Sequence, residues 1–169
     1  LKVSPNIDPE KFDINKYEAF LDALCGERGY QKEATRVTLR YLLGGQYNNL
    51  KELAEENYHQ NPVLQERYGS LENFYEHLQL PDKLSCTIDL ATATGKSYVL
   101  YGIARIMFAE GVVDQVLVLC PSNTIETGLT EKFRSLSADG TLKDLLPDSY
   151  YKFLISLIIK IRFPAGMFF

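Results

Sequence analysis

The first half of the chain carries apolar residues at helical spacing. Residues 15–26 show the pattern most clearly and end at Gly26, a residue type that commonly terminates helices. Their predicted buried face is formed by Tyr17, Phe20, Leu21 and Leu24. Three further segments, 30–45, 49–58 and 70–81, repeat the pattern, and Ser70 is the expected N-cap of the last one. We therefore predict a helical N-terminal module over residues 1–81.

The pattern changes after Pro81. Residues 84–90 and 115–120 are short, mostly apolar runs with β-branched residues, which is typical of strands buried on both faces. Between and after them, residues 98–111 and 123–136 return to helical spacing, with Leu100 on the predicted buried face of the first. A strand–helix–strand–helix order predicts a parallel sheet with flanking helices, so residues 82–169 are expected to form an α/β domain.

Composition and charge exclude several classes of protein. The 169 residues are 46% hydrophobic and 24% charged, which is ordinary for a soluble globular domain. The net charge of −4 disfavours nucleic-acid binding through a broad basic surface. Any contact with DNA or RNA would have to be made in a local groove or with help from a part outside this sequence. Three widely separated cysteines and two histidines predict neither a disulfide framework nor a metal site, and they favour a cytoplasmic location. The apolar tail 153–169 is too interrupted for a membrane span.

The segment 91–97, which reads ATATGKS, has the residues of a phosphate-binding loop. Such a loop needs converging backbone N–H groups, a cation and a magnesium site at the N-terminus of a helix. We assign Lys96 to the β- and γ-phosphates, the Ser97 hydroxyl to Mg²⁺, and the amides of residues 93–97 to the β-phosphate. A bare GKS triplet also arises by chance in ordinary turns. Its place between a predicted strand and a predicted helix favours the loop.

Three segments together resemble superfamily 2 helicases and translocases, most closely the restriction (Res) subunit of type III restriction enzymes. ATATGKS is similar to motif I, with Ala93 where the family usually has glycine. RGYQKEA, residues 28–34, resembles the upstream segment whose glutamine reads adenine, which would make Gln31 the adenine contact, with Arg28 and Tyr30 beside it. Residues 116–133 resemble motif Ia, whose Pro-Ser turn touches the nucleic-acid backbone. The expected nucleic-acid contacts are Pro121, Ser122, Asn123 and Thr124.

The resemblance implies an incomplete first RecA-like lobe with a P-loop. It also implies ATP and Mg²⁺ as cofactors, with Thr92, Ala93, Thr94, Gly95, Lys96 and Ser97 holding the nucleotide. In the parent protein, ATP hydrolysis would drive movement on double-stranded DNA, an endonuclease would be a candidate second activity, and a modification subunit a candidate partner. No Asp-Glu pair follows Gly95, although the family uses one to bind Mg²⁺ and activate water. We therefore expect an N-terminal fragment that binds ATP and hydrolyses it poorly.

Other interpretations of the same residues stay open. Ser122, Asn123 and Thr124 are also common capping residues for a following helix. The gap between Gln31 and Gly95 is wider than is usual in the family, so residues 49–80 would be an insertion. A P-loop kinase for a small molecule, or a non-catalytic interaction domain in which the GKS turn only stabilises the fold, are the alternative functions.

Overall fold

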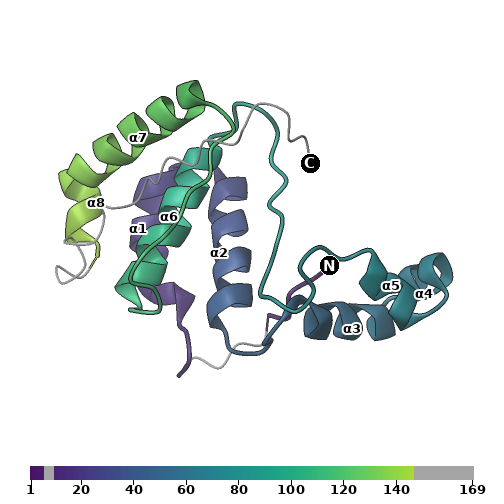
Figure 1. The fold of residues 1–169 in the computed structure, drawn as a ribbon. Helices are drawn as coiled ribbons and strands as arrows, with labels where there is room; N and C mark the ends of the chain where they lie inside the picture. Colours follow the sequence, from purple (N-terminus) through teal and green to yellow (C-terminus); the bar gives the residue numbers. More distant parts are fainter. Residues whose placement is uncertain (6–9, 147–169) are drawn as a thin grey trace. The chain divides into compact units, whose positions relative to one another are not determined.

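The computed structural model describes residues 1–5 and 10–146 (Figure 1). Within these ranges the chain is built from helices joined by turns and extended segments. In chain order they are η1 (Ile14–Tyr17), α1 (Glu18–Cys25), α2 (Gly29–Leu43), α3 (Leu50–Gln60), α4 (Pro62–Tyr68), α5 (Leu71–Glu76), α6 (Lys96–Ala109), α7 (Asn123–Ala138) and α8 (Gly140–Asp144).

The predicted α/β class with a parallel RecA-like sheet is wrong for the described part of the chain, which contains no strand. Residues 84–90 and 115–120 are extended but do not pair into a sheet. Leu117 and Leu119 are 51% and 55% exposed, although the pattern predicts burial on both faces. The physical reason is that a strand satisfies its backbone N–H and C=O groups only on a neighbouring strand, whereas a helix satisfies them within itself.

The predicted helices are confirmed where the 3.6-residue period was clear. All four residues of the predicted face of 15–26 are buried, Tyr17 at the end of η1 and the other three in α1, and α1 ends at Gly26, whose φ of 56° is positive. Ser70 caps α5 by accepting a hydrogen bond from the N–H of Asn73. Helix α6 differs in one respect, because Leu100 is 43% exposed. Its neighbours Val99 and Tyr101 are buried instead.

The described chain divides into two compact units, each made of two chain segments. Unit 1 contains Leu1–Lys16, without residues 6–9, and Lys32–Thr94. Unit 2 contains Tyr17–Gln31 and residues 95–146. The boundary that we place at residue 81 from the sequence stays a prediction.

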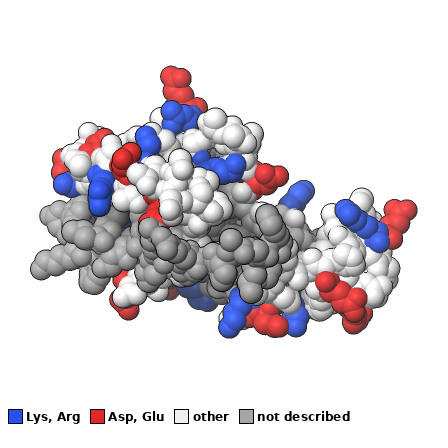
Figure 2. Space-filling view, turned by 45° about the horizontal axis from the view of Figure 1, so that its top comes forward, with Lys and Arg blue, Asp and Glu red and all other residues white. Residues whose placement is uncertain are grey.

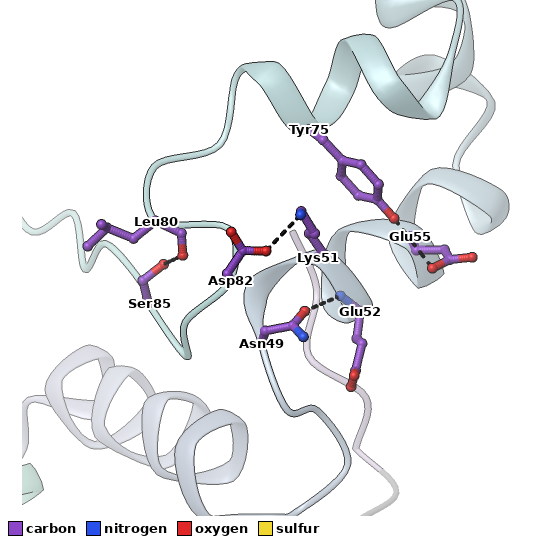
Figure 3. Close-up of polar contacts among 8 residues, drawn as sticks. All are labelled: Asn49, Lys51, Glu52, Glu55, Tyr75, Leu80, Asp82 and Ser85. Atoms are coloured by element: carbon purple, nitrogen blue, oxygen red, sulfur yellow. Dashed lines mark hydrogen bonds and ion pairs between the residues drawn. The ribbon is translucent and has the colours of Figure 1, made fainter.

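Unit 1 has two small aromatic cores. In the first, Tyr41 of α2 packs with Tyr47 and Leu53, and in the second Tyr58 of α3 packs with Phe74 of α5. Polar contacts hold the edges of this unit (Figure 3). Asn49 caps α3 through the N–H of Glu52, and Lys51 forms an ion pair of 2.7 Å with Asp82. The Ser85 hydroxyl donates to the carbonyl of Leu80, which fixes the turn before the extended segment 84–90.

Unit 2 is a layer of helices in which α6 packs against α1 and α7, and α8 contacts both α1 and α7. Ring contacts define the α6–α7 interface, since Tyr101 meets Phe133 edge-on with centroids 5.4 Å apart. The Tyr101 hydroxyl also lies 3.3 Å from that of Ser137. At the far end of α6, the Tyr17 hydroxyl donates to the Glu110 carboxylate at 2.7 Å. Helix α6 is therefore held by contacts near its middle and at its C-terminal end.

In residues 1–5 and 10–146, no helix is long and apolar enough to cross a bilayer. The tail 153–169, for which the sequence predicts no membrane span, lies outside the described residues.

Candidate nucleotide-binding site

The GKS segment forms a turn that leads directly into α6. Helix α6 begins at Lys96, and Gly95 before it has a φ of 78°, a left-handed conformation that glycine adopts without strain. The N–H of Tyr98 closes the first turn on the carbonyl of Gly95 at 2.9 Å. Lys96 is exposed and Ser97 half-buried. The turn leaves the first N–H groups of a 14-residue helix available to an anion, although the strand expected before it is absent from the described residues.

The preceding loop residues form their own turn within unit 1. The hydroxyl and the N–H of Thr94 both donate to the carbonyl of Ala91, at 2.6 and 3.4 Å. Ala93 has a φ of 63°, a rare conformation for a residue with a Cβ. This left-handed position explains in physical terms why glycine would suit it better, as in the family pattern. Thr92 and Ala93 are exposed.

Unit 2 brings Gln31 against Gly95 despite their separation in sequence. The side chain of Gln31 is fully buried at the start of α2. A Cβ placed on Gly95 would lie only 2.5 Å from the Gln31 amide nitrogen. The predicted insertion between them therefore does not separate Gln31 from the GKS turn. Whether its amide reads adenine stays a prediction.

Two cationic side chains lie over the ring of Tyr98, which follows the GKS turn directly. The Arg28 guanidinium lies 5.3 Å from the centre of the Tyr98 ring, and the Lys132 ammonium lies 5.2 Å from it. Lys132 also donates to the Tyr98 hydroxyl at 3.4 Å. Two cations within reach of one ring and of a helix N-terminus favour an anionic ligand there. Tyr30, the third residue of the predicted adenine segment, is instead 47% exposed.

Sequence reasoning missed Tyr98 and Lys132. Tyr98 directly follows the GKS triplet but reads as one more apolar residue of a helix. Lys132 reads as a solvated helix position within the motif Ia segment. Their contact joins residues 34 positions apart, and no local pattern signals such a pair.

The predicted nucleic-acid segment lies at the N-terminus of α7, with all four residues exposed. Ser122 is the N-cap, and its hydroxyl accepts from the N–H of Ile125 at 3.4 Å. The capping interpretation is therefore confirmed for Ser122. The side chains of Asn123 and Thr124 lie at the surface in the first turn, and their contact with DNA stays a prediction.

Charge on the drawn face of the molecule is mixed. Lys and Arg side chains alternate with Asp and Glu there, without a continuous basic stripe among the described residues (Figure 2). No group of three His, Cys, Asp or Glu residues in the described ranges could hold a metal ion.

A cavity of about 570 Å³ lies in unit 1 between α2, α3 and the segment 85–88. Its walls include Val37, Leu53, Leu78 and Ile88, together with the buried phenol of Tyr41. Burial raises the pKa of Tyr41, with Cys86 and Glu52 adding to the effect against a hydrogen bond from the Ser85 backbone. None of the GKS residues lines this cavity, so it is not the predicted nucleotide site.

The family described as type III restriction enzyme, res subunit, matches residues 25–152, which is more than half of the chain. The match begins before Arg28 and includes Gln31, the GKS turn and helix α7. No curated protein and no solved structure matches the chain significantly. On the extent of the family match, the chain belongs to the type III restriction enzyme res-subunit family.

Proposed function

We propose that this chain binds ATP with magnesium through Gly95, Lys96, Ser97 and Gln31 of unit 2, as the nucleotide-binding part of a DNA-translocating restriction enzyme. Family membership indicates a helicase-type ATPase domain in general. The observation that carries the finer proposal is the contact of Gln31 with Gly95 at the beginning of α6. The amide proposed to read adenine and the three residues of the GKS turn then belong to unit 2.

Each residue has a distinct part in the proposed site. Gly95 has no side chain, so a phosphate can approach its backbone closely. The N-terminal end of α6 offers N–H groups and a partial positive charge. Lys96 supplies a full charge for the β- and γ-phosphates, and the Ser97 hydroxyl a magnesium ligand. The bound Mg²⁺ would neutralise phosphate charge and leave the chain's own groups to orient the nucleotide.

Hydrolysis of ATP needs further groups besides those that bind the nucleotide. The sequence after Gly95 contains no Asp-Glu pair to complete the magnesium site and activate water. Since phosphoryl transfer depends mostly on positioning and charge stabilisation, we expect binding without appreciable turnover.

Isothermal titration calorimetry with MgATP tests the proposal. Lys96→Ala removes the phosphate cation, and charge-assisted contacts are worth about 2 kcal/mol, so ATP affinity should fall about thirtyfold. The matched control is Lys83→Ala, which removes an exposed lysine of unit 1. Equal affinities in the two variants would instead favour a GKS turn that only stabilises the fold.

DNA contact through residues 121–124 is the second part of the proposal. The exposed first turn of α7 offers backbone N–H groups and two polar side chains, which suit a phosphate rather than a base edge. Fluorescence anisotropy with a labelled duplex should show weak, salt-sensitive binding that falls further in Asn123→Ala/Thr124→Ala. Unchanged binding in that double variant would exclude this turn as the contact.

A further inference from the structure

The ring of Tyr98 connects the phosphate turn with helix α7. One edge of the ring faces Gly95, since a Cβ on that glycine would lie 3.2 Å from the ring carbon Cδ2. The Lys132 ammonium, which comes from α7, lies 5.2 Å from the ring centre and 3.4 Å from the hydroxyl. All three residues belong to unit 2. The Tyr98 ring thus lies next to both the glycine of the proposed phosphate turn and the Lys132 ammonium.

The Lys132 ammonium lies over an aromatic ring. Lysine side chains on helices normally extend their ammonium into water, because the charge is strongly hydrated and the stem has many rotamers. Lys132 is instead half-buried, and its ammonium lies over the Tyr98 ring. Arg134, two residues further on the same helix, is exposed. Arg134 is therefore the natural control.

A triphosphate would compete with the ring for this ammonium. The face of an aromatic ring attracts a cation only through its quadrupole, whereas phosphate oxygens carry full negative charges. The flexible four-carbon stem of lysine allows the ammonium to change partners without movement of the helix backbone. The ring is therefore a weak resting partner and a phosphate the stronger one.

We propose that Lys132 is a second phosphate-directed cation, held over Tyr98 without nucleotide and transferred to the β- or γ-phosphate when nucleotide binds. This inference rests on the proposed nucleotide-binding function. Lys132 lies on the helix whose first turn is the proposed DNA contact, so α7 contributes to both proposed sites. Tyr98 is then a positioning residue.

Calorimetric titrations of the purified chain separate a phosphate-directed charge from a structural one. Lys132→Gln should weaken MgATP binding about tenfold, while AMP, which lacks the β- and γ-phosphates, should bind as before. Lys132→Arg should restore most of the ATP affinity. Arg134→Gln, which removes the neighbouring charge of α7, should change ATP affinity less than about twofold.

A spectroscopic measurement follows the ammonium directly. The sequence contains no tryptophan, so Tyr98→Trp introduces a single indole next to the Lys132 ammonium. Indole is a better cation partner than phenol, so the contact is kept. MgATP should shift the tryptophan emission as the cation leaves, and the shift should disappear in Tyr98→Trp/Lys132→Gln.

The possible outcomes distinguish the two proposals. If the wild-type chain binds no MgATP, both the nucleotide function and this inference are overturned. If MgATP binds but Lys132→Gln behaves like Arg134→Gln and the emission does not move, the nucleotide function stands and the role of Lys132 is refuted. Equal losses for ATP and AMP in Lys132→Gln would also refute it.

Discussion

A single methyl group added at Gly95 tests the central contact of the candidate site. Gly95→Ala introduces a Cβ that would lie 2.5 Å from the Gln31 amide nitrogen, 3.2 Å from Tyr98 Cδ2 and 3.6 Å from Gln31 Cδ. Real Cβ atoms do not tolerate the first distance, so the buried amide of Gln31 must move. The residue also keeps a φ of 78°, which an alanine adopts only with strain.

The two effects can be given separate magnitudes. A left-handed alanine costs about 1 kcal/mol. Forcing a buried side chain out of a well-packed place costs about 2 kcal/mol, in the middle of the range for overpacking. Gly95→Ala should therefore lower the free energy of unfolding by about 3 kcal/mol. Gly26→Ala is the clash-free control, because Gly26 has nothing within 4 Å of its Cβ position, so its cost of about 2 kcal/mol is backbone strain alone at a φ of 56° and a ψ of −133°.

Urea unfolding followed by far-ultraviolet circular dichroism measures both variants, and a double-mutant cycle isolates the contact. In a Gln31→Ala background the clash is absent, so Gly95→Ala should cost only the backbone term of about 1 kcal/mol. The coupling energy should then be about 2 kcal/mol. A coupling close to zero would show that Gln31 does not pack on the GKS turn, and the proposed site would lose its main support.

Three smaller changes test other parts of the structure. Ala93→Gly should raise the free energy of unfolding by about 0.5 kcal/mol, because glycine relieves the left-handed strain at a φ of 63° but gains freedom in the unfolded chain; a loss of stability in urea melts would contradict this. Ser122→Ala removes the N-cap of α7 and should cost about 1 kcal/mol, with thermal melts as the measurement and no effect as the contrary result. Burial, with the hydrogen bond to Glu56, raises the pKa of Tyr47 to about 12. The folded state therefore holds this proton more tightly than the unfolded state, and its contribution is complete below pH 10 and is lost between pH 10 and 12. Tyr47→Phe should flatten this part of the pH–stability curve, and an unchanged slope would exclude Tyr47 as its source.

Local patterns predicted the helices well, because helix signals are themselves local. The period of apolar residues in α1 and the capping types Ser70 and Gly26 act within a few positions, so they can be read from a short window. The short helices α4 and α8 were missed, although Asn61 before proline and Asp139 before glycine are capping signals. In α6, apolar residues surround most of the helix, so the pattern could not tell that Leu100 would be exposed and Val99 buried.

Non-local contacts were beyond the sequence pattern. A run such as 115–120 shows that a strand would be favourable, but pairing depends on a partner segment that the run itself does not specify. The position of Gln31 beside Gly95 could be expected only from the family resemblance, and the long insertion of residues 49–80 argued against it. The Tyr98–Lys132 contact had no signal at all, because both residues fit ordinary helix positions.

The extended segment 115–120 has a practical consequence for handling the protein. A protease binds its substrate as an extended chain, and this segment already has that shape, with Leu117 and Leu119 open to solvent. Chymotrypsin at low dose should therefore cut here before it cuts within α6 or α7. Two exposed leucines on an extended backbone also invite association between copies at high concentration, so dilute storage will keep the chain in solution longest.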